Sequence, residues 1–317
     1  MQFITTHLYR ALFSLTVAIV LSVGLLAPSD SRADDLLSRI AQTRTITLSY
    51  QTDVFPFSYI EGNKPRGFSI EICNRLVDML KQELQIPALK INWVPVTTAT
   101  QFLTIENKTI DMGCIPTVYT AERQKIVTFS EPYFFSATRY VSRKEDRISD
   151  ISELNGHTVL VKSGTVFVRH IQQANSEHQL SLNIDLGTDN IKAFSALESG
   201  QTPAIVSSDV LLLGQIALSV HPQAFAISAD TLSPRLPIGM PMQKDNADFT
   251  DLINHSMKRL MLSKEFANIY NKWFFEPIMP QGITLNWPMP PELKQSLSST
   301  ALYSYSHAPH SEDNGQP

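Results

Sequence analysis

Apolar and polar positions follow two different periods along the first half of the chain. Residues 45–50 (TITLSY) alternate with a period of two and are rich in β-branched residues, which is typical of a β-strand. Residues 69–84 repeat apolar side chains at helical spacing, and Ser69 is suited to be the N-cap of that helix. The same periods predict further elements: short helices at 35–43 and 101–107, and strands at 89–96 and 110–115. Because strands and helices alternate, we expect parallel strands joined by crossover helices.

The alternation of strand and helix restarts after residue 150. It predicts strands at 158–161, 182–184 and 204–207 and helices at 165–174, 191–199 and 210–218. Extended stretches at 139–142 and 236–243 flank this second unit, and 249–273 is a long helical region. We therefore expect an α/β protein of two lobes joined by two crossing segments. Lobe 1 is expected at 34–138 and 240–295, lobe 2 at 139–239, and a disordered tail at 296–317.

The N-terminus has the pattern of a secretory signal peptide. An uninterrupted run of apolar and small residues occupies 11–27, and Ser31 and Ala33 place small residues three and one before a possible cut. The alternative is a retained membrane anchor, because the run reaches the lower limit of spanning length, about 17 residues. The polar pair Asp34-Asp35 that follows favours cleavage after Ala33. We therefore expect a periplasmic, monomeric mature protein that is not embedded in the membrane.

Composition excludes several classes of function. The formal net charge is −4 without a basic block, so the chain has no electrostatic footprint for nucleic acid. Cys73 and Cys114 are the only cysteines, and they fit either one disulfide or two buried thiols. No histidine lies near either cysteine at the spacing of zinc ligands, so we expect no metal and no cofactor.

Two groups of residues are candidates for binding an anion. Lys162-Ser163-Gly164-Thr165 follows a predicted strand and opens a helix, where free backbone N–H groups suit a carboxylate. Arg123 follows the strand that ends near residue 115, and a guanidinium can hold a carboxylate by two parallel hydrogen bonds. Gly164 could instead be a simple turn residue, and Arg123 a solvated partner of Glu122.

Six segments in order resemble a known family. They are DVFPFSY at 53–59, GFSIEICNRL at 67–76, AERQKIVTFSEPYFF at 121–135, ELNGHTVLVKSGT at 153–165, ALESGQ at 196–201 and NKWFFEPI at 271–278. These are similar to the polar amino-acid-binding proteins of ABC importers (solute-binding protein family 3), above all to the glutamate/aspartate branch. The resemblance implies a periplasmic binding protein-like fold of type II. It also implies delivery of the ligand to an ABC permease with a separate ATPase, which suits a chain without a G-x-x-x-x-G-K-[ST] loop.

The resemblance implies roles for individual residues. Arg123 matches the arginine that grips the ligand α-carboxylate, and Thr165 with the N–H groups of Ser163 and Gly164 matches the clamp from the second lobe. Thr98 is expected beside the ligand side chain.

Other positions depart from the glutamate/aspartate branch. That branch carries arginines where this chain has Gln51 and Gln101, and a histidine where it has Asn190. A buried carboxylate without a compensating cation costs several kcal/mol. We therefore expect glutamate and aspartate to bind poorly.

The residues that would hold the ligand amine differ as well. Hydroxyl residues of the family correspond to Pro116 and Val118, and the amine-binding aspartate corresponds to Ser208, with Asp209 adjacent. Either Asp209 takes that role by a shift of one residue, or the ligand is an organic acid without an α-amine.

Aromatic residues and two rival functions complete the sequence picture. Phe55 and Phe57 alternate at the expected cleft mouth, and one of them is expected to stack on the ligand. We expect a binding protein and not an enzyme. The rivals are an enzyme on the same fold, similar to cyclohexadienyl dehydratase, with Asp189 and Asp209 as candidate acids, and a sensory protein that presents ligand to a receptor.

Overall fold

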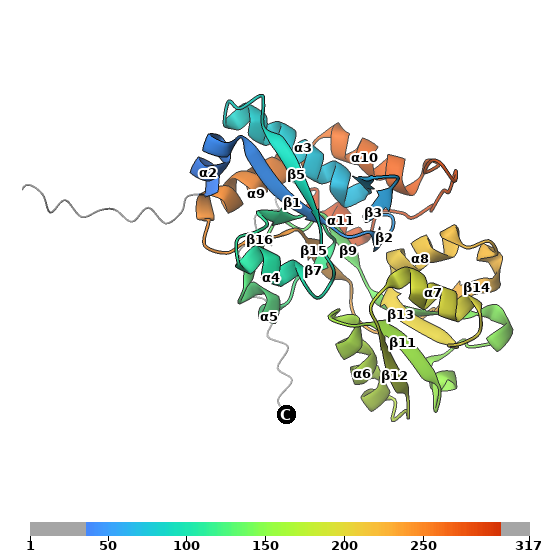
Figure 1. Ribbon diagram of the computed structural model, residues 1–317. Coiled ribbons are helices and arrows are strands. Elements are labelled where there is room, and N and C mark those ends of the chain that lie inside the picture. The colour runs from blue at the N-terminus through green and yellow to red at the C-terminus, as the bar shows by residue number, and fades with distance from the viewer. Residues whose placement is uncertain (1–35, 299–317) are drawn as a thin grey trace, which may run out of the picture. The chain divides into compact units, whose positions relative to one another are not determined.

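The computed structural model describes residues 36–298, and within that range it is built on two five-stranded sheets (Figure 1). The helices are α2 (Leu36–Thr43), α3 (Phe68–Glu83), α4 (Gln101–Glu106), α5 (Ala121–Gln124), α6 (Phe167–Glu177), α7 (Asn190–Glu198), α8 (Asp209–Leu218), α9 (Ala247–Met261), α10 (Lys264–Phe274) and α11 (Pro291–Ser296), with 3-10 turns η1 (Lys144–Asp146), η2 (Ile151–Leu154) and η3 (Pro222–Ala224). The strands are β1 (Thr45–Tyr50), β2 (Asp53–Val54), β3 (Ser58–Glu61), β4 (Lys64–Arg66), β5 (Lys90–Pro95), β6 (Met112–Gly113), β7 (Thr117–Val118), β8 (Val127–Phe129), β9 (Phe134–Ser136), β10 (Thr138–Arg143), β11 (Thr158–Lys162), β12 (Asn183–Gly187), β13 (Ala204–Ser208), β14 (Phe225–Ile227), β15 (Leu236–Gly239) and β16 (Pro241–Gln243).

The first sheet combines strands from distant parts of the chain. Its order is β5-β1-β6-β16-β8, and β1 is parallel to both β5 and β6, as predicted. Strand β16, which comes more than a hundred residues after its neighbours, pairs antiparallel with β6 and β8. Helices α3, α9 and α10 pack on one another beside this sheet, and α3 buries Ile72, Leu76 and Leu80 completely.

The N-cap of helix α3 lies two residues before the predicted one. Gly67 is the N-cap residue, and its φ of 133° is unfavourable for residues with a side chain. A Cβ atom at Gly67 would lie 2.1 Å from the backbone oxygen of Phe57. The predicted cap at Ser69 is therefore wrong, and the Ser69 hydroxyl instead bonds to the Tyr133 hydroxyl at 2.6 Å.

The second sheet has the order β12-β11-β13-β10-β14, with parallel pairs β11–β12 and β11–β13. Alternate residues of a strand face opposite sides of a sheet, and the core divides accordingly. Val159 and Val161 of β11 belong to the cluster that includes Ile171 of α6. Ile205 of β13 belongs to a separate cluster with Phe194 of α7. Helix α6 therefore covers one face and α7 the other (Figure 1).

Two segments carry the chain from one large sheet to the other. Strand β9 leads into the second sheet, β15 leads back to the first, and the two pair antiparallel with Leu236 opposite Ser136. The predicted crossing at 139–142 is wrong in position, because these residues lie within β10 of the second sheet. The predicted helical region at 249–273 is two helices, α9 and α10. The Ser263 hydroxyl caps the second one by accepting a bond from the Glu265 N–H at 3.2 Å.

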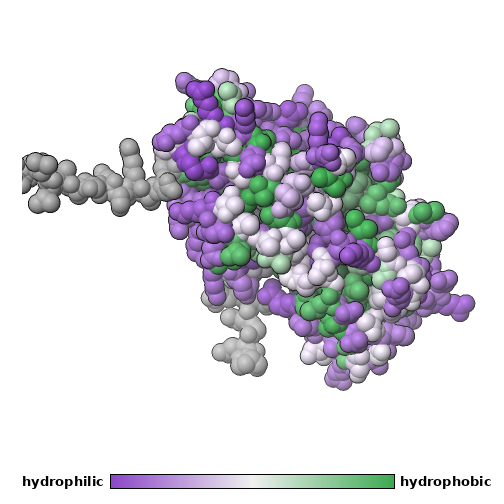
Figure 2. Space-filling view, viewed as in Figure 1, coloured by the Kyte–Doolittle hydropathy of each residue, from purple (hydrophilic) through white to green (hydrophobic). Residues whose placement is uncertain are grey.

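The surface of the molecule mixes polar and apolar side chains. On the face drawn in Figure 2, hydrophilic residues are interspersed with smaller apolar groups. No helix within residues 36–298 has the length and apolar character that crossing a membrane requires. The predicted signal peptide at 1–33 lies outside the described residues, as does the predicted tail beyond residue 298.

Candidate functional site

One pocket collects most of the residues that the sequence singled out. It holds about 480 Å³ of space free of protein atoms, part of it open to solvent. The lining residues are Gln51, Val54, Thr98, Gln101, Ile115, Pro116, Thr117, Val118, Arg123, Lys162, Thr165, Val166, Phe167, Asn190 and Leu211. Several of them follow the carboxyl ends of β1, β6, β11 and β12, where open α/β sheets bind ligands.

Arg123 enters this pocket from the four-residue helix α5. The Thr120 hydroxyl caps the helix by accepting a bond from the Arg123 N–H at 3.1 Å. One guanidinium nitrogen donates to Val118 O at 2.8 Å, and the guanidinium carbon lies 5.1 Å from the centre of the Phe102 ring. Burial lowers the pKa of Arg123 to about 10, so the side chain stays cationic at neutral pH. The arginine is therefore a positioned charge at the pocket wall.

The loop between β11 and α6 approaches Arg123 from the second sheet. A guanidinium nitrogen of Arg123 lies 3.4 Å from Gly164 O, and the Thr165 hydroxyl donates to Lys162 O at 2.6 Å. Gly164 has a φ of 73°, and a Cβ atom there would lie 3.3 Å from Cγ2 of Thr98. The loop thus needs glycine both for its left-handed backbone and for its close approach to Thr98.

Two of the three expected backbone donors in this loop are open to a ligand. The Ser163 N–H already donates to Gly187 O at 2.8 Å. The N–H groups of Gly164 and Thr165 have no hydrogen-bond partner within the described residues. Helix α6 begins at Phe167, two residues later than predicted.

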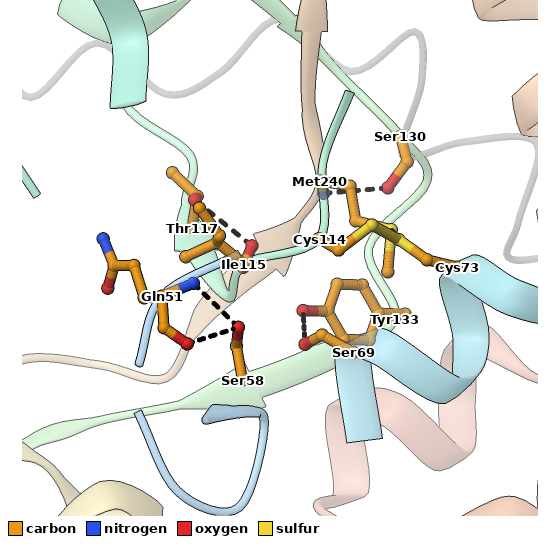
Figure 3. The surroundings of a disulfide bond; sticks show 10 residues. All are labelled: Gln51, Ser58, Ser69, Cys73, Cys114, Ile115, Thr117, Ser130, Tyr133 and Met240. Carbon is orange, nitrogen blue, oxygen red and sulfur yellow. Dashed lines mark hydrogen bonds between the residues drawn. A yellow bond between two sulfur atoms is a disulfide. The ribbon is translucent and has the colours of Figure 1, made fainter. Parts of the chain in front are cut away.

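Amide side chains form another wall of the pocket. The Gln51 amide nitrogen lies 3.4 Å from the Thr98 hydroxyl, and the Gln101 amide nitrogen lies 3.4 Å from Thr98 O. The Ser58 hydroxyl fixes the backbone of Gln51 by accepting from its N–H at 2.9 Å and donating to its carbonyl at 3.0 Å (Figure 3). The Asn190 amide nitrogen donates to Asp53 O at 3.1 Å.

An ion pair that sequence reasoning missed lies beside the pocket. The Lys162 ammonium is 2.6 Å from Oδ2 of Asp53, and both side chains are nearly buried. The Asn190 N–H donates to the same Asp53 oxygen at 3.0 Å. Lys162 was visible as part of the loop after β11, but no local pattern identifies its partner, which is 109 positions away.

The four residues at the positions of the family's amine-binding residues lie in two different places. Pro116 and Val118 line the pocket. Ser208 and Asp209 are buried outside its lining. The Asp209 carboxylate is 2.8 Å from a guanidinium nitrogen of Arg235 and also accepts from the Ser136 hydroxyl. This carboxylate is therefore fully engaged beside the crossing strands.

The two aromatic candidates lie away from the pocket lining. Phe57 is fully buried and makes ring contacts with Phe68, Phe134 and Phe274 in the core. Phe55 lines a different hollow, which it shares with Tyr59 and others. The alternation of aromatics in this segment did not reveal which way each ring points.

A disulfide holds the loop that forms one side of the pocket. Cys73 of α3 and Cys114 are bonded, with their Cα atoms 6.1 Å apart (Figure 3). This settles the choice between a disulfide and two thiols that the sequence left open. The next residues, Ile115 and Pro116, line the pocket.

Comparisons with known proteins agree with this architecture. The chain is 35% identical over 272 residues to the L-glutamate/L-aspartate-binding protein of Pseudomonas aeruginosa, covering 84% of this chain and 90% of that protein. It is 30% identical over 281 residues to the glutamate/aspartate import solute-binding protein of Escherichia coli, covering 88% of this chain and 93% of that protein.

A solved structure and a family match complete the comparison. The crystal structure of a solute receptor for L-cysteine of Neisseria gonorrhoeae has a TM-score of 0.66 and 25% identity, covering 75% of this chain and 92% of that one. Residues 46–276 match the family of bacterial extracellular solute-binding proteins, family 3. The chain belongs to family 3 of the bacterial extracellular solute-binding proteins.

Proposed function

We propose that this protein captures a small amino acid or related carboxylate between its two lobes and delivers it to an ABC import permease with a separate ATPase. The observation that carries the proposal is the meeting of Arg123 with the loop at Gly164 and Thr165, at one pocket. Arg123 supplies a positioned cation, and the loop supplies two N–H groups that have no hydrogen-bond partner in the described part of the chain. A carboxylate accepts hydrogen bonds from both kinds of donor at once.

We further propose a division of the chain into two lobes, which the two separate five-stranded sheets support. Lobe 1 consists of 34–138 and 240–295, and lobe 2 of 139–239. We propose that residues 1–33 are removed as a signal peptide, which leaves a periplasmic, monomeric protein. The Escherichia coli relative is named as an import solute-binding protein, which supports a role in uptake.

We infer that the protein binds its ligand without converting it. The described pocket lining contains no aspartate, glutamate, histidine, cysteine or tyrosine, and its one lysine, Lys162, is paired with Asp53. The two acids considered for catalysis have other partners. Asp189 accepts from the Lys192 N–H at 2.9 Å, and Asp209 pairs with Arg235. A ligand recovered unchanged after long incubation with the protein is the expected result.

The test begins with a thermal-shift screen of the mature protein against amino acids, dicarboxylates and keto acids. A ligand at a hundredfold excess over its Kd stabilises the folded state by about 2.7 kcal/mol, which gives a clear shift. Calorimetry then compares the wild type with Arg123→Ala, and with Arg147→Ala as a control at an exposed arginine.

We expect Arg123→Ala to bind the ligand at least about tenfold more weakly than the wild type. The variant loses a pair of charge-assisted hydrogen bonds, and each such bond contributes about 1.5–3 kcal/mol. The Arg147→Ala protein should bind as the wild type does. Unchanged affinity in Arg123→Ala would refute the proposed role of the pocket.

A further inference from the structure

Three neighbouring side chains form a polar corner of the pocket that contains no charge. Gln51, Thr98 and Gln101, called the amide corner below, all line the pocket. Gln51 and Gln101 are each only 4% exposed. Both amides are therefore shielded from solvent beside the pocket, and polar atoms in such a place need a hydrogen-bond partner.

The orientation of the Gln101 amide is fixed by its neighbour. Thr98 O can only accept a hydrogen bond, so the Gln101 atom that faces it at 3.4 Å is the amide nitrogen. The other end, Oε1, is then a buried acceptor, and it has no hydrogen-bond partner within the described residues. Leaving a buried acceptor unpaired is costly, so the occupant of the pocket should bring an N–H or O–H donor to this atom.

Gln51 is less constrained than Gln101. Its amide lies 3.4 Å from the Thr98 hydroxyl, which can donate or accept. Gln51 can therefore offer the ligand either its carbonyl oxygen or its amide nitrogen. The amide corner as a whole offers one fixed acceptor and one adaptable group.

The charges around the pocket limit what the ligand can carry. Arg123 and Lys162 are the charged residues in the described lining. The Lys162 charge is compensated by Asp53 at 2.6 Å, which leaves the Arg123 charge for one carboxylate of the ligand. A second carboxylate would have no compensating cation. It would also bring only acceptor oxygens to Oε1 of Gln101, which is itself an acceptor. A cationic side chain would find no acid in the lining.

We infer that the ligand, besides the carboxylate held by Arg123, carries an uncharged group that donates a hydrogen bond to Oε1 of Gln101. A primary carboxamide fits best, because its NH₂ donates to Gln101 while its oxygen accepts from the Gln51 amide. This inference rests on the proposed function and narrows its ligand to small carboxylates that also carry a carboxamide.

Pairs of isosteric ligands test the inference directly. Calorimetry of the mature wild type would compare glutamine with glutamate and, as a pair without an α-amine, glutaramate with glutarate, because each pair differs only in the distal group. Sites built to hydrogen-bond a polar group reject analogues that lack it by large factors. We expect an amide to bind at least about a hundredfold more tightly than its acid partner.

A variant series assigns that preference to Gln101. Gln101→Met keeps a side chain of similar length but removes the acceptor, so it should weaken binding of the preferred amide at least about tenfold. Gln82→Met, at an exposed position of α3, is the matched control and should bind as the wild type does.

The outcomes separate this inference from the proposed function. An acid that binds as tightly as its amide, or unchanged affinity in Gln101→Met, overturns the inference. The inference is also overturned if a dicarboxylate or an apolar amino acid binds tightly. If that binding still depends on Arg123, the proposed function remains intact. If no carboxylate in the screen binds, or if binding ignores Arg123, the proposed function itself fails.

Discussion

Arg123 is held in position by its own lobe. The Thr120 cap restrains its backbone, and Val118 O and the Phe102 ring restrain its guanidinium. A side chain that is ordered before binding loses less conformational entropy when the ligand arrives. We therefore expect the short helix α5 to contribute to affinity, although none of its residues is buried.

Asp209 is the residue for which sequence and structure suggest different roles. The sequence left it open as an amine ligand, whereas the structure pairs it with Arg235 and Ser136. Its position beside Ser208 gave no signal of this, because Arg235 lies 26 positions further along the chain. Local spacing cannot reveal a partner that only the folded chain brings near.

We predict that Asp209→Asn reduces stability and leaves binding nearly unchanged. Removing one member of a buried ion pair costs about 3–5 kcal/mol, and the partial exposure of Arg235 reduces this to about 2 kcal/mol. Urea denaturation measures the loss, and calorimetry should give a Kd within about threefold of the wild type. A collapse of affinity at unchanged stability would instead make Asp209 an amine ligand.

At the level of elements, the disulfide connects α3 with the end of β6. It joins residues 41 positions apart, and one of them directly precedes the pocket residues Ile115 and Pro116. The link restricts the unfolded chain and anchors a wall of the pocket.

We predict that the reduced protein is less stable than the oxidised one. Closing a loop of this length contributes about 4 kcal/mol in the chain-entropy account. Guanidinium denaturation with and without a reductant measures the difference on the same chain. A Cys73→Ala/Cys114→Ala protein should resemble the reduced form. Coinciding oxidised and reduced curves would contradict this account.

The elements themselves were largely predictable from local pattern. Strand β1 was predicted with its observed bounds because TITLSY alternates cleanly and has β-branched residues. Strand β6 was predicted too long, because a run of apolar residues also fits the buried loop that contains Cys114. The start of α3 was missed because the contact that requires Gly67 comes from a separate segment at Phe57.

At the scale of the whole molecule, Asp53 connects the two lobes. Its carboxylate accepts from Lys162 and from the Asn190 N–H, which belong to the second sheet and to α7. Arg123 makes a second contact of this kind with Gly164. We therefore expect these contacts to favour a closed arrangement, in which a ligand is shielded from solvent.

We predict that Asp53→Asn weakens ligand binding about tenfold and accelerates ligand release, because the closed state loses an ion pair. Stopped-flow measurement of release gives the rate, and Asp185→Asn on the exposed part of β12 is the control. Tighter binding of a carboxylate by Asp53→Asn would show instead that Lys162 is available to the ligand.

The pocket was only partly predictable because it forms between segments far apart in the chain. The sequence identified Arg123 and Thr165, since each follows a strand end with recognisable chemistry. It did not show that Asp53 would compensate Lys162, which changes the charge available to a ligand. Pairing across the lobes depends on the folded geometry, and local periodicity carries no information about it.

A crystal structure of the mature protein with its ligand tests the central claim most directly. We predict one ligand carboxylate with its oxygens about 2.7–3.2 Å from the guanidinium nitrogens of Arg123 and from the Thr165 N–H. A ligand whose carboxylate lies elsewhere, with Arg123 and Thr165 untouched, would contradict the account.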